Sequence, residues 1–400
     1  MTCGKISGGS ALRRALVQVA VLLLAVRVAG AAEAQPGVIS AALQPFVDSH
    51  RLAGAVVLIA DRERILDTET VGFADIAAAR PMQADTLFWI ASQTKAVTAA
   101  ALMMLVDEGK LALTDPVEKY VPEFANVKVG PRDAKDPTPL HAPAQAITIR
   151  EILSHTSGLR FLNTKDHQVI DSVPLATSVQ HDLADPLLFE PGTRYNYSNE
   201  GIDTAGLIVQ LVSGMPYERF VQERLLTPLG MRDTTFFPTP DAVKRLAKAY
   251  RPTKDKAGLE AIPINYLTYP LDGPNRYPAP GGGLFATAAD VARFCQMLLN
   301  RGVCAGGRRC LSEDAVAAMT RKQTGDAVKD SYGLGLAVGP TWFGHGGAYA
   351  TNMAVDTKRG VITVFMVQHN GFPGNANEMF AALGKATEQV IRRETAAGGH

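Results

Sequence analysis

Apolar runs at both ends of the chain predict the strands of one sheet. Near the N-terminus, AGAVVLIA and ILDTETVGFA flank a polar turn at residues 61–64, which is the pattern of a β-hairpin. Near the C-terminus, SYGLGLAVG, GAYATNMAVDT and VITVFMVQ predict three further strands. Residues 38–52 and 375–393 predict one helix at each end. The expected fold class is therefore α+β, an antiparallel five-stranded sheet built from both chain ends and flanked by the terminal helices.

The middle of the chain carries capping signals that predict a mostly helical region. Thr148 and Glu151 form a capping box before a short helix, and Gly214 ends a helix that begins near residue 200. Thr287 caps a further helix, which stops before Gly302. We therefore expect a large helical insertion between the two groups of strands.

Three long irregular stretches interrupt this helical region, at residues 123–146, 165–190 and 253–283. They are rich in proline, glycine or charge, and loops of this length often form binding walls or lids. The domain prediction is a single domain, 35–400, of two lobes with a cleft between them. The α/β lobe comprises residues 38–88 and 325–395, and the helical lobe comprises residues 89–324.

The first 34 residues have the pattern of an export signal. Lys5, Arg13 and Arg14 precede an apolar run over residues 15–26, and small residues follow as far as Ala34. This order predicts a signal peptide, 1–34, and a periplasmic or secreted mature protein. The run is too short for a membrane span, so we expect none in the mature protein. General secretion and twin-arginine export both remain open.

Composition narrows the possible partners and cofactors. Removal of residues 1–34 takes away four basic residues and one acidic residue, so the formal net charge changes from +1 to −2. A near-neutral chain without basic clusters argues against nucleic acid as a partner. The eight histidines have no metal-ligand spacing, so we expect no metal site and no cofactor. Cys304 and Cys310 flank the turn-like AGGRR, and export would permit a disulfide between them.

The most informative chemistry lies in an almost uncharged segment. Between Asp85 and Asp107 the only charge is Lys95, three residues after Ser92, and the residues beyond it are apolar on nearly every face. This pattern predicts a helix buried on all sides, with both side chains on one side of its first turn. A buried amine needs partners or loses its proton, and an amine beside a hydroxyl activates that hydroxyl as a nucleophile. For this motif by itself, a surface lysine at a helix start is the more frequent explanation.

Two further motifs favour the chemical interpretation. Tyr-Ser-Asn at 197–199 stands in a turn before a predicted helix, and a phenol in that place can shuttle a proton. His-Gly-Gly at 345–347 leads into a predicted strand, where glycines let backbone N–H groups approach a ligand closely. Each of these motifs is a weak signal when it is considered alone.

Together, the three motifs resemble those of the penicillin-recognising serine hydrolases. The chain looks most similar to the class C β-lactamase, D-alanyl-D-alanine carboxypeptidase and family VIII carboxylesterase group. The likeness extends over residues 38–390 and implies a β-lactamase/transpeptidase-like fold, in agreement with the split sheet and helical insertion. Further segments that support it are HTSGL, PGTRYNYSNEGIDTAGLIVQLVSG, PLGMRDT and GGGLFATAADVARF.

The resemblance implies a role for each motif residue. Ser92 would be the acylated nucleophile, Lys95 its base, and Tyr197 a second base and proton shuttle. Which of Lys95 and Tyr197 takes the serine proton is left open. Asn199 would orient Lys95 and the substrate carbonyl, and the backbone N–H groups of Ser92 and Ala348 would form the oxyanion hole.

The third motif differs from the Lys-Thr-Gly or His-Thr-Gly that is usual in the β-lactamases and peptidases of this group. His345 is largely neutral at pH 7 unless perturbed, and Gly346, followed by Gly347, offers no hydroxyl. A substrate carboxylate would therefore be held weakly, whereas an uncharged ester would lose nothing. The favoured hypothesis is a secreted serine hydrolase that acts as a carboxylesterase on small uncharged esters through a Ser92 acyl-enzyme.

Two alternatives stay open at this point. The first is a D-Ala-D-Ala-type peptidase or weak β-lactamase, in which Arg160 or Arg276 replaces the missing carboxylate ligand. The second is a penicillin-binding relative without turnover, against which the complete set of Ser92, Lys95 and Tyr197 argues. The sequence predicts a small-molecule ester or acyl-peptide as the partner and leaves the oligomeric state undetermined.

Overall fold

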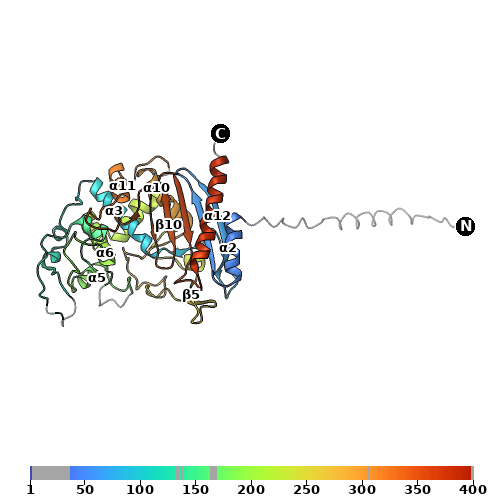
Figure 1. The fold of residues 1–400 in the computed structure, drawn as a ribbon, viewed down its shortest axis with the longest axis horizontal. Coiled ribbons are helices and arrows are strands. Elements are labelled where there is room, and N and C mark those ends of the chain that lie inside the picture. Colours follow the sequence, from blue (N-terminus) through green and yellow to red (C-terminus); the bar gives the residue numbers. More distant parts are fainter. Residues whose placement is uncertain (2–36, 132–135, 137, 163–168, 305, 398–400) are drawn as a thin grey trace. The chain divides into compact units, whose positions relative to one another are not determined.

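The computed structural model describes residue 1 and residues 37–131, 136, 138–162, 169–304 and 306–397 (Figure 1). The predicted signal peptide lies outside the described residues, apart from Met1. The chain divides into two units, residues 1–37 and 38–400, and the fold below is that of the second. Over the described part of the chain, none of the helices is both long and apolar enough to cross a bilayer.

A seven-stranded antiparallel sheet assembles from the two ends of this unit, in the order β3-β2-β1-β11-β10-β9-β8. Its central pairing joins distant segments, with Val56 opposite Met366. The α+β class and the assembly of the sheet from both ends are confirmed. The strands are β1 (Gly54–Ala60), β2 (Ile65–Asp75), β3 (Arg80–Pro81), β8 (Ala337–Val338), β9 (Trp342–Gly346), β10 (Asn352–Asp356) and β11 (Val361–Met366).

The prediction of five strands is wrong by two. The edge strand β3 has only two residues, which is too short for an alternating pattern to be visible. Strand β9 has the sequence WFGHG, in which two glycines interrupt the apolar alternation. The predicted strand at 331–339 is reduced to the two residues of β8.

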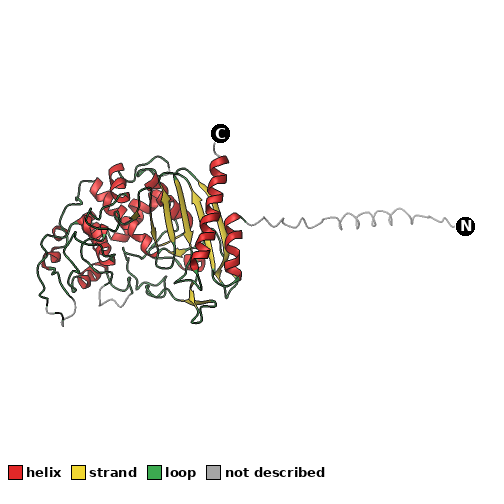
Figure 2. Cartoon of the chain, in the orientation of Figure 1, coloured by secondary structure: helices red, strands yellow, loops and turns green. Residues whose placement is uncertain are grey.

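Helices cover both faces of the sheet (Figures 1 and 2). The terminal helices α2 (Val38–Asp48) and α12 (Ala376–Ala397) pack against each other and join a core cluster with Val57 of β1. On the other face, α10 (Ala288–Leu299) packs against β1, β10 and β11, and Val56 faces that larger cluster. Strand β1 is buried along its whole length because both of its faces are covered.

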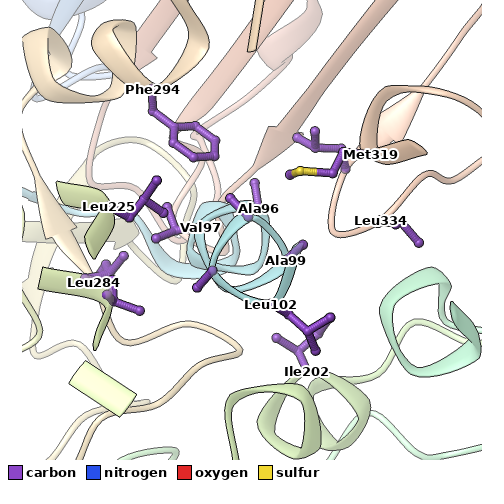
Figure 3. Close-up of a cluster of buried hydrophobic side chains, with 14 of the residues drawn as sticks. Ala96, Val97, Ala99, Leu102, Ile202, Leu225, Leu284, Phe294, Met319 and Leu334 are labelled. Carbon is purple, nitrogen blue, oxygen red and sulfur yellow. The ribbon is translucent and has the colours of Figure 1, made fainter. Parts of the chain in front are cut away.

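At the centre of the larger cluster lies α3 (Thr94–Asp107), which begins directly after the short turn η1 (Ala91–Gln93). Every residue from Thr94 to Leu105 is buried, which confirms the expectation of a helix covered on all sides. Figure 3 shows Ala96, Val97, Ala99 and Leu102 of this helix among side chains from other elements, among them Phe294, Met319, Leu225, Leu284 and Ile202. This dense packing fixes the position of the helix start.

The remaining elements belong mostly to the helical insertion. The capping box of Thr148 and Glu151 and the end of a helix before Gly214 are confirmed. The helices are α4 (Ile149–Ser154), α5 (Leu175–Asp182), α6 (Asn199–Ser213), α7 (Tyr217–Phe220), α8 (Thr227–Leu229), α9 (Pro240–Arg245) and α11 (Glu313–Thr320), with short turns η2 (Val117–Lys119) and η3 (Pro122–Asn126) and the π-helical η4 (Val221–Leu226). Two small sheets pair β4 (Phe88–Trp89) with β7 (Phe285–Ala286) and β5 (Ala249–Pro252) with β6 (Leu259–Ile262).

The long stretches predicted as irregular are partly structured. Helix α5 lies within 165–190 and β6 within 253–283, so the expectation of loop is wrong there. Both elements are short and are flanked by proline or glycine, which favoured the prediction of loop. Cys304 and Cys310 are joined by a disulfide across a turn after α10.

Candidate active site

The nucleophile candidate Ser92 is presented by a strained turn between β4 and α3. Ala91, directly before it, takes a φ of 47°, in the left-handed region that a residue with a Cβ adopts only at a cost of about 1–2 kcal/mol. The strand pairing of β4 with β7 and the bond from the Ile90 N–H to the Leu284 carbonyl hold this turn. Ala91 and Gln93 are buried, whereas Ser92 is only partly covered.

Lys95 is completely buried and has three polar neighbours. Its Nζ lies 3.3 Å from Ser92 Oγ, 2.6 Å from Asn199 Oδ1 and 2.6 Å from the Gly281 carbonyl oxygen. A neutral amine has two N–H groups and one lone pair. Because the amide and carbonyl oxygens can only accept, they take the two N–H groups, and the lone pair is left for the Ser92 hydroxyl. The arrangement suits removal of the serine proton.

Burial lowers the pKa of Lys95 to about 7, and the nearby Asp203 carboxylate acts in the opposite direction. The amine is therefore close to half deprotonated at neutral pH, which is the range in which a general base works best. Asp203 also accepts the Gly281 N–H at 2.9 Å. The same carboxylate thus tunes Lys95 and holds Gly281, the residue whose carbonyl accepts from Lys95 Nζ.

Gly281 approaches this site closely because it has no side chain. A Cβ at this position would lie 3.1 Å from Asn199 Oδ1, tighter than ordinary van der Waals contact. The segment is aligned with the nucleophile turn by two further bonds, from Trp89 Nε1 to the Gly282 carbonyl and from the Leu284 N–H to Thr94 Oγ1. The triple glycine at 281–283 therefore builds one wall of the site.

Tyr197 lies over Lys95, with 4.7 Å between Lys95 Nζ and the centre of the phenol ring. Its hydroxyl is buried beside the Ser92 hydroxyl and makes no well-aligned hydrogen bond within the described part of the chain. Burial raises the pKa of Tyr197 far above its usual value, and the neighbouring Ser92 hydroxyl offsets a part of that rise. The phenol is therefore protonated at neutral pH, so that Lys95 is the more readily available base and Tyr197 is able to donate a proton.

His345 is neutral and both of its ring nitrogens are engaged. Nδ1 lies 2.6 Å from the Gly346 carbonyl oxygen, which can only accept, so Nδ1 carries the proton. Nε2 then accepts from the Tyr332 hydroxyl at 2.8 Å. Burial and, to a smaller extent, the nearby Lys95 charge together lower the pKa of His345 to about 4. This residue offers neither a charge nor a free donor to a substrate carboxylate.

The two glycines of the third motif differ in their surroundings. A Cβ on Gly347 would meet Thr351 Oγ1 and would lie 2.6 Å from the Ile90 carbonyl oxygen, whereas a Cβ on Gly346 has no neighbour nearer than 3.8 Å. Gly347 therefore lets the end of β9 close onto the backbone just before the nucleophile. Ala348 follows directly and is exposed. Its N–H as an oxyanion donor stays a prediction.

The arginines considered as substitute carboxylate ligands are both engaged elsewhere. Arg276 is almost fully buried, donates to Asp171 at 2.7 Å, and donates to two backbone carbonyls. This buried pair fastens the stretch around residue 276 to the stretch around residue 171. Arg160 donates from Nε to the Pro186 carbonyl and is partly buried.

A small cavity of about 20 Å³ lies beside Asn199. Its lining combines apolar side chains, among them Phe161 and Ile170, with the carboxylates of Asp182, Glu200 and Asp203. Phe161 also stacks on the ring of Tyr197, with 5.9 Å between centroids. Among the residues that the structure describes, no three histidine, cysteine, aspartate or glutamate side chains are grouped so that they could hold a metal ion.

Three residues that contribute polar groups to the site were not predicted from the sequence motifs: Gly281, Asp203 and Tyr332. Asp203 was open to detection, because it follows Asn199 by four residues on α6 and shares its face. Gly281 was harder to predict, because its position at the start of a run of three glycines is only a weak sign of a place in the site. Nothing in the local sequence connects Tyr332 with His345, since the contact depends on the arrangement before β8.

A serine held against a buried lysine, with a tyrosine above both, defines a serine hydrolase of the Ser-Xaa-Xaa-Lys type. The chain matches the family described as Beta-lactamase over residues 39–388, and it belongs to this family. Protein Rv1367c of Mycobacterium tuberculosis (strain ATCC 25618 / H37Rv) is 37% identical over 330 residues, 79% of this chain and 78% of the relative. Esterase EstB of Burkholderia gladioli is 29% identical over 381 residues, 83% of this chain and 90% of EstB.

The solved structure of EstCE1, described as a hydrolase with promiscuous acyltransferase activity, has a similar fold. Its TM-score is 0.72 and its sequence identity 26%, and the match covers 87% of this chain and 97% of EstCE1. The fold prediction is confirmed at the level of β-lactamase/transpeptidase-like architecture, with the strand number corrected as above.

Proposed function

We propose that the protein is an exported carboxylesterase that cleaves small uncharged esters through an acyl-enzyme on Ser92. The observation that carries the preference for uncharged esters is the state of His345. Its ring is buried and neutral, and both of its nitrogens are occupied by Tyr332 and Gly346. Burying a carboxylate against such a group would be costly, because no charge compensates it. Arg276 does not compensate either, since its guanidinium is paired with Asp171.

The steps follow from the positions of the side chains. Ser92 Oγ attacks the ester carbonyl carbon while its proton passes to the lone pair of Lys95 Nζ. The oxyanion forms at the backbone N–H groups of Ser92 and Ala348, each worth roughly 10²–10³ in rate. The carbon–oxygen bond to the alcohol then breaks, and the alcohol leaves with a proton that Tyr197 relays. Water adds to the acyl-enzyme by the same route in reverse and releases the acid.

The relatives support this assignment through their names. EstB of Burkholderia gladioli and the lovastatin esterase of Penicillium rubens are both esterases by name. Penicillin-binding protein 4* of Bacillus subtilis is a relative as well, at 28% identity over 63% of this chain.

A matched pair of substrates tests the proposal most sharply. p-Nitrophenyl butyrate and p-nitrophenyl hemisuccinate have the same leaving group and differ by a methyl in place of a carboxylate. We expect rapid cleavage of the butyrate, at least tenfold lower kcat/KM for the hemisuccinate, and no cleavage by Ser92→Ala. Fast hydrolysis of nitrocefin or of a D-Ala-D-Ala peptide, with no cleavage of the butyrate, would instead identify a β-lactamase or peptidase.

Export is a separate part of the proposal. Expression of the full chain in a bacterial host should give a periplasmic protein whose N-terminus is Gln35. Recovery of uncleaved protein in the cytoplasm would contradict it.

A further inference from the structure

His155 accepts hydrogen bonds from the residues directly before and directly after Tyr197. It ends α4 in the left-handed conformation, with φ 62°, and it is completely buried. Its backbone carbonyl accepts the Asn196 N–H at 2.9 Å, and its Nδ1 accepts the Ser198 N–H at 3.2 Å. The two bonds bracket Tyr197 in the chain. Because Nδ1 accepts, the ring is the neutral tautomer with its proton on Nε2, in agreement with a pKa that burial holds well below its usual value.

The ring of His155 also packs against two phenols. Its centroid lies 4.6 Å from that of Tyr197 and 4.6 Å from that of Tyr332. Tyr332 is buried, and its hydroxyl donates to His345 Nε2. His345 in turn donates from Nδ1 to the Gly346 carbonyl. A continuous series of contacts therefore runs from the turn before α6 to the end of β9.

We propose that His155 and Tyr332 form a brace that connects the turn before α6, which carries Tyr197, with the end of β9. They act as positioning residues for Tyr197 and for the Gly346–Ala348 segment. The proposal rests on the proposed function only in that Ser92 must react through this site. Their hydrogen bonds and ring contacts are with the segment that carries Tyr197 and with His345, so they act through these groups. Their effect is to hold the phenol over Lys95 and to fix the peptide that precedes the predicted oxyanion donor.

The brace carries no charge, which suits its place beside Lys95. A cationic imidazole at His155 or His345 would oppose protonation of the lysine, and both rings are neutral at working pH. Positioning of this kind affects the reaction more than binding, because displacement of a catalytic group by about 1 Å can cost on the order of 10²-fold in rate.

The chain offers variants that separate the links of the brace. Tyr332→Phe keeps the ring contact with His155 and removes only the bond to His345. His155→Leu removes the acceptor for the Ser198 N–H, whereas His155→Asn keeps an acceptor near that position and tolerates the left-handed backbone. Tyr250→Phe is the matched control, because Tyr250 is also buried and its hydroxyl accepts one bond, from the Ile76 N–H at 2.8 Å, away from Ser92.

The measurement is the rate at which a fluorophosphonate labels Ser92, together with kcat and KM for p-nitrophenyl butyrate and the thermal midpoint of unfolding. We expect Tyr332→Phe and His155→Leu each to lower the labelling rate and kcat about 10- to 100-fold, with KM changed less than threefold. The double variant should lose no more than the worse single variant, because either change breaks the same series of contacts. His155→Asn should recover most of the rate, and Tyr250→Phe should label like the wild type.

Two results would overturn the brace. Losses that multiply in the double variant would show two independent roles, and an equal rate loss in Tyr250→Phe would show that the effect is general destabilisation. Labelling keeps this test distinct from that of the proposed function. A wild type that labels rapidly but cleaves no ester refutes the esterase proposal, while the comparison of labelling rates among the variants still decides the brace.

Discussion

Replacement of Lys95 by methionine removes the buried amine and leaves a side chain of similar length. The folded protein holds the pKa of Lys95 at about 7, against 10.5 for the free side chain. Between these values the unfolded chain binds one more proton than the folded protein, so this group makes the unfolding free energy rise with pH. One pKa unit corresponds to about 1.4 kcal/mol, and the rise from pH 7 to pH 9.5 should therefore be roughly 3 kcal/mol.

The variant lacks this rise. Its loss of two N–H donors leaves Asn199 Oδ1 and the Gly281 carbonyl without a partner, at about 1–3 kcal/mol each, but that cost does not depend on pH. The difference in unfolding free energy, wild type minus Lys95→Met, should hence increase by about 3 kcal/mol from pH 6 to pH 9.5. Urea unfolding at several pH values measures it. Groups remote from Lys95 cancel between the two proteins, and burial keeps His155 and His345, whose pKa values the lysine charge lowers, neutral over this range. Parallel stability curves would refute the reasoning, because Lys95 would then keep an ordinary pKa.

Three further outcomes follow from the geometry of the site. The kcat/KM for p-nitrophenyl butyrate should rise with pH to a plateau with a midpoint near 7, since only neutral Lys95 accepts the serine proton. The variant Asp203→Asn keeps an oxygen for the Gly281 N–H but removes a charge that raises the pKa of Lys95, so its midpoint should lie at lower pH. An unchanged midpoint would contradict the assignment of Lys95 as the base. Gly347→Ala should reduce kcat by at least about tenfold and Gly346→Ala by less than threefold, because only a Cβ on residue 347 collides with the Ile90 carbonyl. Equal effects would count against the close approach of the end of β9 to the Ile90 backbone. Arg276→Met should lower the unfolding free energy by about 3–5 kcal/mol in urea titrations, since it leaves the Asp171 carboxylate buried without its partner, whereas a change below 1 kcal/mol would mean that water reaches the pair.

Local patterns were enough to predict the framework of the fold. The alternation in the N-terminal hairpin and in the strands that became β10 and β11, with a capping box at Thr148, gave the sheet and several helices correctly. The patterns did not predict β3 and β9. Strand β3 has only two residues, and two glycines in β9 interrupt the alternation of apolar and polar residues. That both ends contribute to one sheet followed from the need of both apolar ends for a common core, whereas the pairing of β1 with β11 within that sheet is known only from the structure.

The site was accessible from the sequence only in part. Ser92 and Lys95 share a helical turn, so their proximity follows from local geometry. The convergence of Tyr197 and His345 on them is a tertiary property, which only the resemblance to a family supplied. The Tyr332 bond to His345 could not be anticipated, because no spacing rule relates a loop residue to a later strand.

Direct observation of the acylated serine tests the central claim. Mature protein mixed with p-nitrophenyl butyrate, quenched in acid within one turnover and digested, should yield a Ser92 peptide heavier by one butyryl group. Ser92→Ala should show no such adduct, and Lys95→Met should form it far more slowly. Release of p-nitrophenol at full rate without an adduct at Ser92, or with the adduct on another residue, would contradict the acyl-enzyme mechanism.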